Sequence, residues 1–244
     1  MPCGQNFLID KNVALKFTSL IPENYPVFEI GAGKGALTQY LLEKSRKVVV
    51  IEKDLFLVNF LKNRFATYKN FEVVEGDVLK FTPEFKEPFY IIGNLPYQIS
   101  TEIIFWLAKV KNFIQAFLSF QKETAERFLS KEGSPLYGRT SLTVGVFFKA
   151  EKLFDISRTC FKPSPKISST VVSFKRKNVD IDVEKWREFL NLCFFSKRKI
   201  LISNLKKAGF DAENFFKQNN LPKNLRPHQA SPEIFLKLFD MIKR

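Results

Sequence analysis

Four consecutive residues, Asn94-Leu95-Pro96-Tyr97, follow an apolar run and combine two hydrogen-bond acceptors, a rigid turn and an aromatic ring. The side-chain oxygen of Asn94 and the backbone carbonyl of Leu95 could accept both N–H bonds of an adenine amine. Pro96 would stiffen the turn, and Tyr97 could stack on a base that has left its helix. Held in this way, the amine would direct its lone pair at an electrophilic methyl group. The alternative is an ordinary turn with a half-buried tyrosine.

The glycine-rich segment FEIGAGKGALT lies between a predicted strand and a predicted helix, where glycines let a ligand approach the backbone. Gly31, Gly33 and Ala36 fit the GxGxxG/A pattern of dinucleotide-binding sites. Together with Glu29 and Gly35, the same glycines also fit the ExGxGxG pattern of S-adenosylmethionine enzymes. The glycine spacing alone therefore leaves both cofactors open.

Two acidic residues end the next two predicted strands. Glu52 follows Gly31 by 21 residues and could accept hydrogen bonds from ribose hydroxyls with either cofactor. Asp77 could accept a hydrogen bond from the amine of an adenine, which favours S-adenosylmethionine. Acids also end strands as turn formers or helix caps, so neither residue is decisive alone. Their convergence with the glycine turn on one sheet edge nevertheless predicts a single cofactor crevice.

Short apolar runs alternate with helix-period stretches between residues 27 and 120, which predicts a parallel α/β sheet. The predicted strands span residues 27–32, 47–52, 71–76, 90–94, 114–120 and 169–177. The predicted helices span 36–44, 55–65, 101–110, 183–195, 198–208 and 231–242, the last with Ser231 as N-cap and Pro232 at its first position. Residues 140–157 fit either one β-rich element or a helix followed by a strand. The polar stretch NVDID favours a boundary between a cofactor-binding domain, 1–178, and a small helical domain, 179–244.

The charge balance favours a polyanionic partner. The chain has 39 Lys and Arg against 25 Asp and Glu, a net charge of +14. Basic side chains near phosphates release condensed counterions and so gain affinity, although a basic solubilising surface is the alternative. No apolar run approaches the ~20 residues of a membrane-spanning helix, and we see no signal peptide. We therefore expect no membrane partner and a cytoplasmic location.

The cysteines and the single histidine exclude several chemistries. Cys3, Cys160 and Cys193 are far apart, which predicts free thiols and neither a disulfide framework nor a metal site. His228 is the only histidine, so we expect no Ser-His or Cys-His catalysis. The rigid FKPSPK stretch could present Phe161 to a ligand, although a core phenylalanine is equally consistent with its composition.

Taken in order, the motifs resemble those of the KsgA-type ribosomal RNA adenine dimethyltransferases, relatives of the Erm resistance methyltransferases. The resemblance lies in GQNFLID (4–10), EIGAGKG (29–35), VIEKD (50–54), EGDV (75–78), IIGNLPYQIS (91–100), FQKETAERF (120–128), SPLYGRTSL (134–142) and FKPSPKISSTVV (161–172). It covers about three quarters of the chain, and the combination of GQNFL with GNLPY is highly specific.

The resemblance implies roles for individual residues. Those implied for S-adenosylmethionine are Gln5, Asn6, Leu8, Glu29, Gly31, Gly33, Glu52, Asp77, Val78 and Asn94; those implied for the target adenine are Asn94, Leu95, Pro96, Tyr97 and Phe161. The implied fold is a Rossmann-like sheet of seven strands, one of them antiparallel, with a small C-terminal helical domain. The implied activity is N6,N6-dimethylation of two adjacent adenosines near the 3′ end of small-subunit rRNA.

Three other functions remain open at this point. An Erm-like enzyme would act on large-subunit rRNA, and a DNA adenine methyltransferase would use related chemistry at the NLPY turn. A non-catalytic RNA-binding assembly or transcription factor could keep the same fold, although the presence of Glu52, Asp77 and Asn94 argues against a dead site. We expect the small-subunit rRNA or its precursor particle as partner, and a monomer, because basic faces should repel each other.

Overall fold

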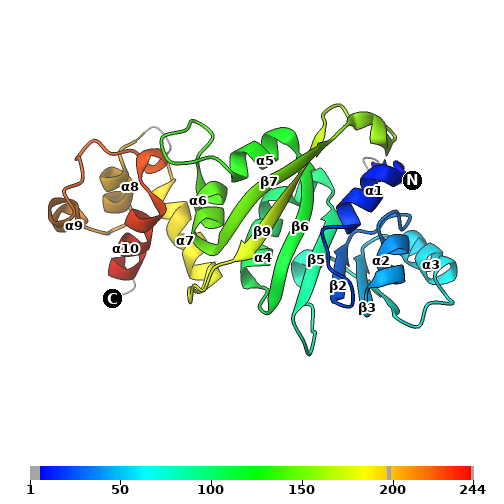
Figure 1. Ribbon diagram of the computed structural model, residues 1–244. Helices are drawn as coiled ribbons and strands as arrows, with labels where there is room; N and C mark the ends of the chain where they lie inside the picture. The colour runs from blue at the N-terminus through cyan, green and yellow to red at the C-terminus, as the bar shows by residue number, and fades with distance from the viewer. Residues whose placement is uncertain (1–5, 197–198, 243–244) are drawn as a thin grey trace. The chain divides into compact units, whose positions relative to one another are not determined.

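The computed structural model describes residues 6–196 and 199–242, without the side chain of Tyr97. Its main sheet has seven strands in the order β4-β3-β2-β5-β6-β9-β7 (Figure 1). Their bounds are β2 (Pro26–Ile30), β3 (Lys47–Glu52), β4 (Phe71–Glu75), β5 (Phe89–Asn94), β6 (Phe113–Gln121), β7 (Phe148–Ile156) and β9 (Ser169–Arg176). The strands from β4 to β6 are parallel, whereas β9 runs antiparallel to β6. The predicted seven-stranded α/β sheet is therefore confirmed.

The order of the strands creates a crevice beside β2. The chain passes from β2 to β3 on one side, and β5 pairs with β2 on the other side. The strand order thus reverses at β2, and ligands of such sheets bind beyond the carboxyl ends of the strands at this point. Every residue of β2 and β5 is buried except Asn94, which is half-buried at the end of β5. Asn94 is therefore presented where a ligand is expected.

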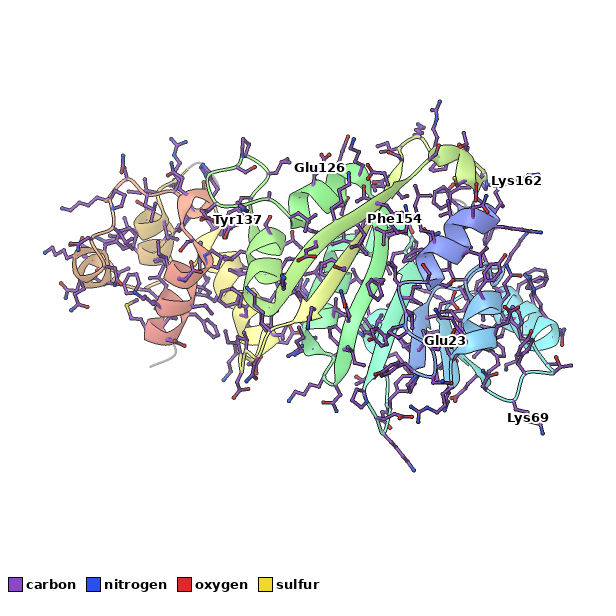
Figure 2. All side chains as sticks on the ribbon, in the orientation of Figure 1. Glu23, Lys69, Glu126, Tyr137, Phe154 and Lys162 are labelled. Atoms are coloured by element: carbon purple, nitrogen blue, oxygen red, sulfur yellow. The ribbon has the colours of Figure 1, made fainter. Side chains whose placement is uncertain are left out.

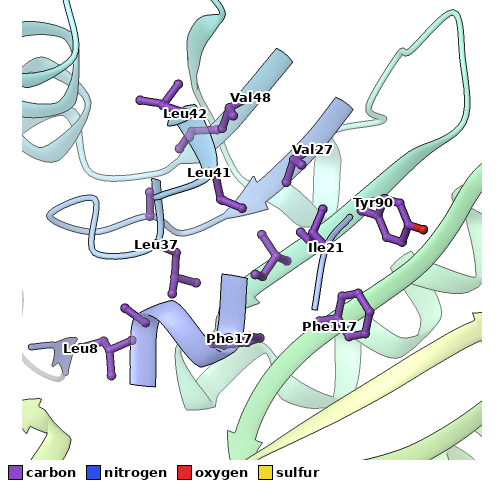
Figure 3. Packing of buried hydrophobic residues seen from close by; sticks show 14 of the residues in the cluster. Leu8, Phe17, Ile21, Val27, Leu37, Leu41, Leu42, Val48, Tyr90 and Phe117 are labelled. Atoms are coloured by element: carbon purple, nitrogen blue, oxygen red, sulfur yellow. The ribbon is translucent and has the colours of Figure 1, made fainter. Parts of the chain in front are cut away.

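Helices cover both faces of the sheet. These are α1 (Lys11–Thr18), α2 (Thr38–Lys44), α3 (Leu55–Arg64), α4 (Ser100–Lys109) and α5 (Lys122–Phe128). Figure 3 shows Phe17 of α1 and Leu41 of α2 in one apolar cluster with Val27 of β2. The next residue, Phe28, stacks on Trp106 of α4, because successive side chains of a strand point to opposite faces.

The edge strand β7 is tied to the N-terminal helix by an aromatic contact. Phe154 of β7, labelled in Figure 2, meets Phe17 edge to face with 6.2 Å between the ring centroids. The ammonium of Lys16 lies 4.3 Å from the centroid of the same ring. This cation–π contact adds to the apolar packing that holds α1 in place.

A second antiparallel pair joins distant segments of the chain. Strand β1 (Phe7–Leu8) pairs with β8 (Phe161–Lys162), with Leu8 opposite Phe161. The Ile9 amide donates to the Cys160 carbonyl at 2.9 Å and extends the pairing by one bond. The described part of the N-terminal motif, residues 6–10, therefore lies beside the start of the FKPSPK motif.

The chain forms two compact units, residues 1–125 with 150–176, and residues 126–149 with 177–244. The second contains α6 (Arg139–Phe147), α7 (Val183–Cys193), α8 (Leu201–Lys207), α9 (Glu213–Gln218) and α10 (Pro232–Ile242). Its core surrounds Trp186, which contacts Phe147, Phe189 and Phe239 and donates from Nε1 to Thr143 at 3.2 Å. The domain boundary predicted at residue 178 stays a prediction. Across the described residues, no helix combines the length and apolar character needed to cross a membrane.

Candidate active site

A cavity opens at the carboxyl ends of β2, β3 and β5, with about 800 Å³ of empty space including the part open to solvent. The residues that line it are Asn6, Phe7, Leu8, Glu29, Gly31, Ala32, Gly33, Lys34, Ala36, Leu37, Glu52, Asn94, Leu95, Pro96 and Phe161. Both candidate motifs, the glycine turn and the NLP turn, therefore meet at one cavity, all of it within the first compact unit.

The glycine turn leaves its backbone accessible. Gly31 and Gly33 have φ angles of +65° and +58°, a region that costs other residues about 1–2 kcal/mol. A β-carbon on Gly31 would meet no heavy atom within 4 Å, so open space lies beside this backbone. A β-carbon on Gly33 would lie 3.0 Å from the Phe7 ring, so strand β1 packs directly against the turn.

Glu52 is held by three backbone amides. Its Oε2 accepts from the Gly33 N–H at 3.1 Å, and its Oε1 accepts from the Lys53 and Asp54 N–H groups at 2.9 and 3.1 Å. The carboxylate is 6% exposed. A carboxylate offers about four acceptor positions, so these bonds leave one free, on Oε2. The side chain is thus fixed in orientation with capacity for one further donor.

Glu29, on β2, also lines the cavity. It is 1% exposed, and its Oε2 accepts from the Thr38 hydroxyl at 2.7 Å. Burial, with a smaller contribution from the nearby Glu52, raises the pKa of Glu29 to about 8 against the opposing effect of the Thr38 bond. The carboxyl is therefore protonated at neutral pH, so it adds no second negative charge beside Glu52.

This buried carboxyl predicts a pH dependence of stability. An unfolded Glu29 releases its proton near pH 4.5, whereas the folded one retains it up to about pH 8. The folded state binds more protons in this window, so its stability falls as the pH rises, by up to about 1.4 kcal/mol per pH unit, and levels off above pH 8. We expect Glu29→Gln, measured by urea unfolding from pH 5 to 8.5, to remove this slope.

The exposed residue Glu84 provides the control for this measurement, since Glu84→Gln makes the same chemical replacement away from the cavity. Its unfolding free energy should follow the pH profile of the parent chain. A Glu29→Gln profile with the parent slope would show that the buried carboxyl is not the source of the pH dependence.

Asp77 and Val78 do not line the cavity. Asp77 is the N-cap of a short 3-10 helix and accepts from the Leu79 N–H at 3.1 Å. Burial alone would raise the pKa of Asp77, but the Leu79 amide and the Lys53 ammonium, 3.1 Å away, hold it below its usual range. Asp77 still lies at the correct edge of the sheet, because the Gly76 amide donates to the Glu52 carbonyl at 3.0 Å.

Asn94 lies at the cavity wall with both ends of its amide engaged. Its Oδ1 accepts from the Ser119 hydroxyl at 2.6 Å, and its Nδ2 lies 3.5 Å from the Asn6 carbonyl oxygen. Leu95 is 3% exposed, whereas Pro96 is exposed at the surface. Gln5 and the side chain of Tyr97 fall outside the described residues, so their predicted roles stay predictions.

Several cavity residues were not predicted from the sequence. They are Phe7, Ala32, Lys34 and Leu37, with Thr38 and Ser119 behind them as partners of Glu29 and Asn94. Phe7 lies between Asn6 and Leu8, which were both expected to contact S-adenosylmethionine. Its position between them could have indicated a place in the cavity wall. Ser119 is the polar residue within the run AFLSF (116–120), a signal that could have marked it for a specific hydrogen bond.

Comparison with known proteins identifies the family. The sequence profile described as ribosomal RNA adenine dimethylase matches residues 2–244. The chain belongs to this family. It is 40% identical to the Ribosomal RNA small subunit methyltransferase A of Malacoplasma penetrans, covering 96% of this chain and 89% of that one. It is 39% identical to the protein of the same name from Mycoplasma mobile, covering 97% and 95%. The resemblance predicted from the motifs is confirmed.

Solved structures agree with this dimethylase fold. A dimethyladenosine transferase from Plasmodium falciparum superimposes with a TM-score of 0.81 at 29% identity, covering 97% of both chains. The 23S rRNA methyltransferase ErmE superimposes with a TM-score of 0.72 at 24% identity, covering 98% of this chain and 100% of that one. The second likeness concerns the fold alone.

Proposed function

We propose that this dimethylase family member transfers methyl groups from S-adenosylmethionine to N6 of two adjacent adenosines near the 3′ end of small-subunit rRNA, giving N6,N6-dimethyladenosine. The observation that carries the proposal is that the Asn94 amide lines the same cavity as the glycine turn and Glu52. An acceptor for an amine and an acceptor for a ribose thus share one crevice. The relatives named as small-subunit rRNA methyltransferases support the choice of RNA.

The donor side of the cavity would bind the nucleoside and the amino acid portions separately. When bound, S-adenosylmethionine supplies a methyl group on a positively charged sulfur. The free position on Glu52 Oε2 would accept a ribose hydroxyl, and Asp77 at the adjacent strand end would accept from the adenine amine. The open space beside the Gly31 backbone would leave room for the methionine portion. Asn6 and Leu8 would form the cavity wall on the side of β1.

The target side would hold the adenine by its amine and its face. Asn94 Oδ1 and the Leu95 carbonyl would accept hydrogen bonds from the two N–H groups, which reduces the delocalisation of the nitrogen lone pair into the ring and directs it at the methyl group. Pro96 would keep the turn rigid, while Tyr97 and Phe161 would contact the base. Methyl transfer leaves an acidic ammonium on N6 that loses its proton to water, so no side-chain base is needed. The same steps repeat on the monomethylated amine, whose one remaining N–H still finds an acceptor.

Basic side chains beside the cavity would receive the RNA backbone. Lys34 lines the cavity, and Arg158, Lys162 and Lys166 are exposed in the segment around Phe161, with Lys162 labelled in Figure 2. Phosphate contacts of this kind supply much of the affinity for nucleic acid. We propose that the partner is small-subunit rRNA in a precursor particle, and that the enzyme acts as a monomer in the cytoplasm.

The direct test is mass spectrometry of nucleosides after incubating the protein and S-adenosylmethionine with immature small subunits. We expect N6,N6-dimethyladenosine to form on these particles, and neither naked large-subunit rRNA nor duplex DNA to compete as a substrate. Methylation of large-subunit rRNA instead would indicate an Erm-like enzyme. Binding of the particle without any methylated product would indicate a non-catalytic assembly factor.

A further inference from the structure

Ser119 holds the amide on which the proposed chemistry depends. Asn94 and Ser119 are direct partners in the parallel pairing of β5 with β6, so their side chains lie on the same face of the sheet. The distance of 2.6 Å between the Ser119 Oγ and Asn94 Oδ1 is at the short end of the range for O–H···O bonds. Ser119 is 1% exposed and does not line the cavity. It therefore acts on Asn94 and not on a ligand.

Two neighbours together decide which end of the Asn94 amide is the oxygen. The Ser119 hydroxyl can donate or accept, so alone it would tolerate either orientation. The Asn6 carbonyl can only accept, so it requires the Nδ2 group on its side. At 3.5 Å this second contact is too long to hold the amide by itself. Ser119 is consequently the anchor, and Asn6 selects the orientation.

The oxygen fixed in this way retains acceptor capacity. A side-chain amide oxygen has two lone pairs, of which the Ser119 hydroxyl uses one. Asn94 is half-buried at the cavity wall, so the second lone pair remains for a donor from the cavity. A flipped amide would instead donate one N–H to the Ser119 hydroxyl and bring its other N–H toward the donor groups of an adenine amine. The site can therefore accept the adenine amine only when Oδ1, and not Nδ2, faces the cavity.

We propose that Ser119 is a positioning residue for methyl transfer, which holds Asn94 Oδ1 toward the amine of the target adenine through its hydroxyl. This inference rests on the proposed function, since it concerns the same site. It predicts that Ser119 affects the rate of the methyl-transfer step and leaves donor binding unchanged, because Ser119 touches neither the cavity nor the glycine turn.

Ser173 provides a matched control. It is a buried serine, 3% exposed, on β9, and it pairs with Phe117 of β6, two residues before Ser119. Ser119→Ala and Ser173→Ala each remove one hydroxyl from the same pair of strands. Ser119→Cys and Ser173→Cys keep the connectivity of the side chain, add the same small increase in volume at both positions, and replace the hydroxyl with a weak donor.

The experiment compares single-turnover methylation of immature small subunits, donor affinity by calorimetry and the midpoint of thermal unfolding. We expect Ser119→Ala to lower the rate about tenfold, as for loss of one orienting hydrogen bond, with the donor Kd and the particle KM within about twofold of the parent. Ser119→Cys should be slowed several-fold, and both Ser173 variants should keep the parent rate. If Ser119→Ala does not fold, the comparison between the two cysteine variants decides.

Each outcome separates the two proposals. A parent protein that forms no dimethyladenosine on the particles contradicts the proposed function. An active parent whose Ser119 and Ser173 variants react at equal rates contradicts only the positioning role. A Ser119→Ala variant with weakened donor binding and an unchanged transfer rate would likewise overturn that role, because it would mean that the hydroxyl supports the donor site.

Discussion

Replacing Asn94 with alanine should lower the rate of methyl transfer by roughly 10²–10³-fold, the effect seen when one preorganised hydrogen-bonding group is removed from an active site. The amide oxygen is the side-chain acceptor proposed for the target amine, and alanine leaves that amine conjugated with its ring. Donor affinity should fall by no more than about tenfold, because Glu52 and the glycine turn remain. Single-turnover methylation and calorimetry with S-adenosylmethionine measure the two effects separately.

Asn59 provides a control for this variant. It is exposed on α3 and away from the cavity lining, so Asn59→Ala should methylate at the parent rate. An Asn94→Ala protein that is folded, binds the donor and still methylates at the parent rate would remove Asn94 from the chemistry. Loss of donor binding as large as the loss of rate would assign Asn94 to the donor site alone.

Replacing Glu52 with glutamine should weaken binding of S-adenosylmethionine about hundredfold, equivalent to roughly 3 kcal/mol. The carboxylate accepts three backbone N–H bonds, and a glutamine has only one oxygen to accept them. If that oxygen keeps the Lys53 and Asp54 amides, the new amide group faces the Gly33 N–H, donor against donor. The position left for a ribose hydroxyl is lost as well. Calorimetry with the donor alone measures the change.

Glu75 is the matched control for Glu52. The two residues are register partners on β3 and β4, but Glu75 is exposed and does not line the cavity. Glu75→Gln should bind the donor with the parent affinity. A Glu52→Gln protein with an unchanged donor Kd would mean that the acid at the end of β3 only shapes its own turn, as acids at strand ends often do.

Most of the sheet could be predicted because its strands are continuous apolar runs. The predicted strand at 47–52 matches β3 residue for residue, and the others match within one or two residues at each end. The ambiguous stretch 140–157 is a helix followed by a strand, α6 and then β7. Its β-branched residues are compatible with the helix because they are buried there, so that packing overrides their weak helix preference.

The elements that were missed are all short. Strands β1 and β8 have two residues each, too few for an alternating pattern, and exist because distant segments pair with each other. Helices α1, α5 and α9 are eight, seven and six residues long, and none of them was predicted. Such short helices depend on contacts such as the Asp10 cap, whose Oδ1 accepts from Val13 at 3.0 Å, more than on their own propensity.

The site residues that were predicted all belong to short sequence motifs. The glycine turn, Glu52, Asn94 and Phe161 were expected together, and all line the cavity. Asp77 follows its strand as expected but lies outside the cavity lining. The bond between Ser119 and Asn94 depends on the register between two strands that are 25 residues apart in sequence, which no local motif contains. Residues that orient a catalytic group through such pairing require the three-dimensional structure.

The most direct measurement is to locate N6,N6-dimethyladenosine in rRNA from cells that lack this protein and carry either the parent gene or the Asn94→Ala variant. We predict that the parent restores dimethylation at two adjacent adenosines near the 3′ end of small-subunit rRNA, and that Asn94→Ala, present at the same level, leaves both unmodified. Equal dimethylation in both strains, or a modified nucleotide only in large-subunit rRNA, would contradict the account.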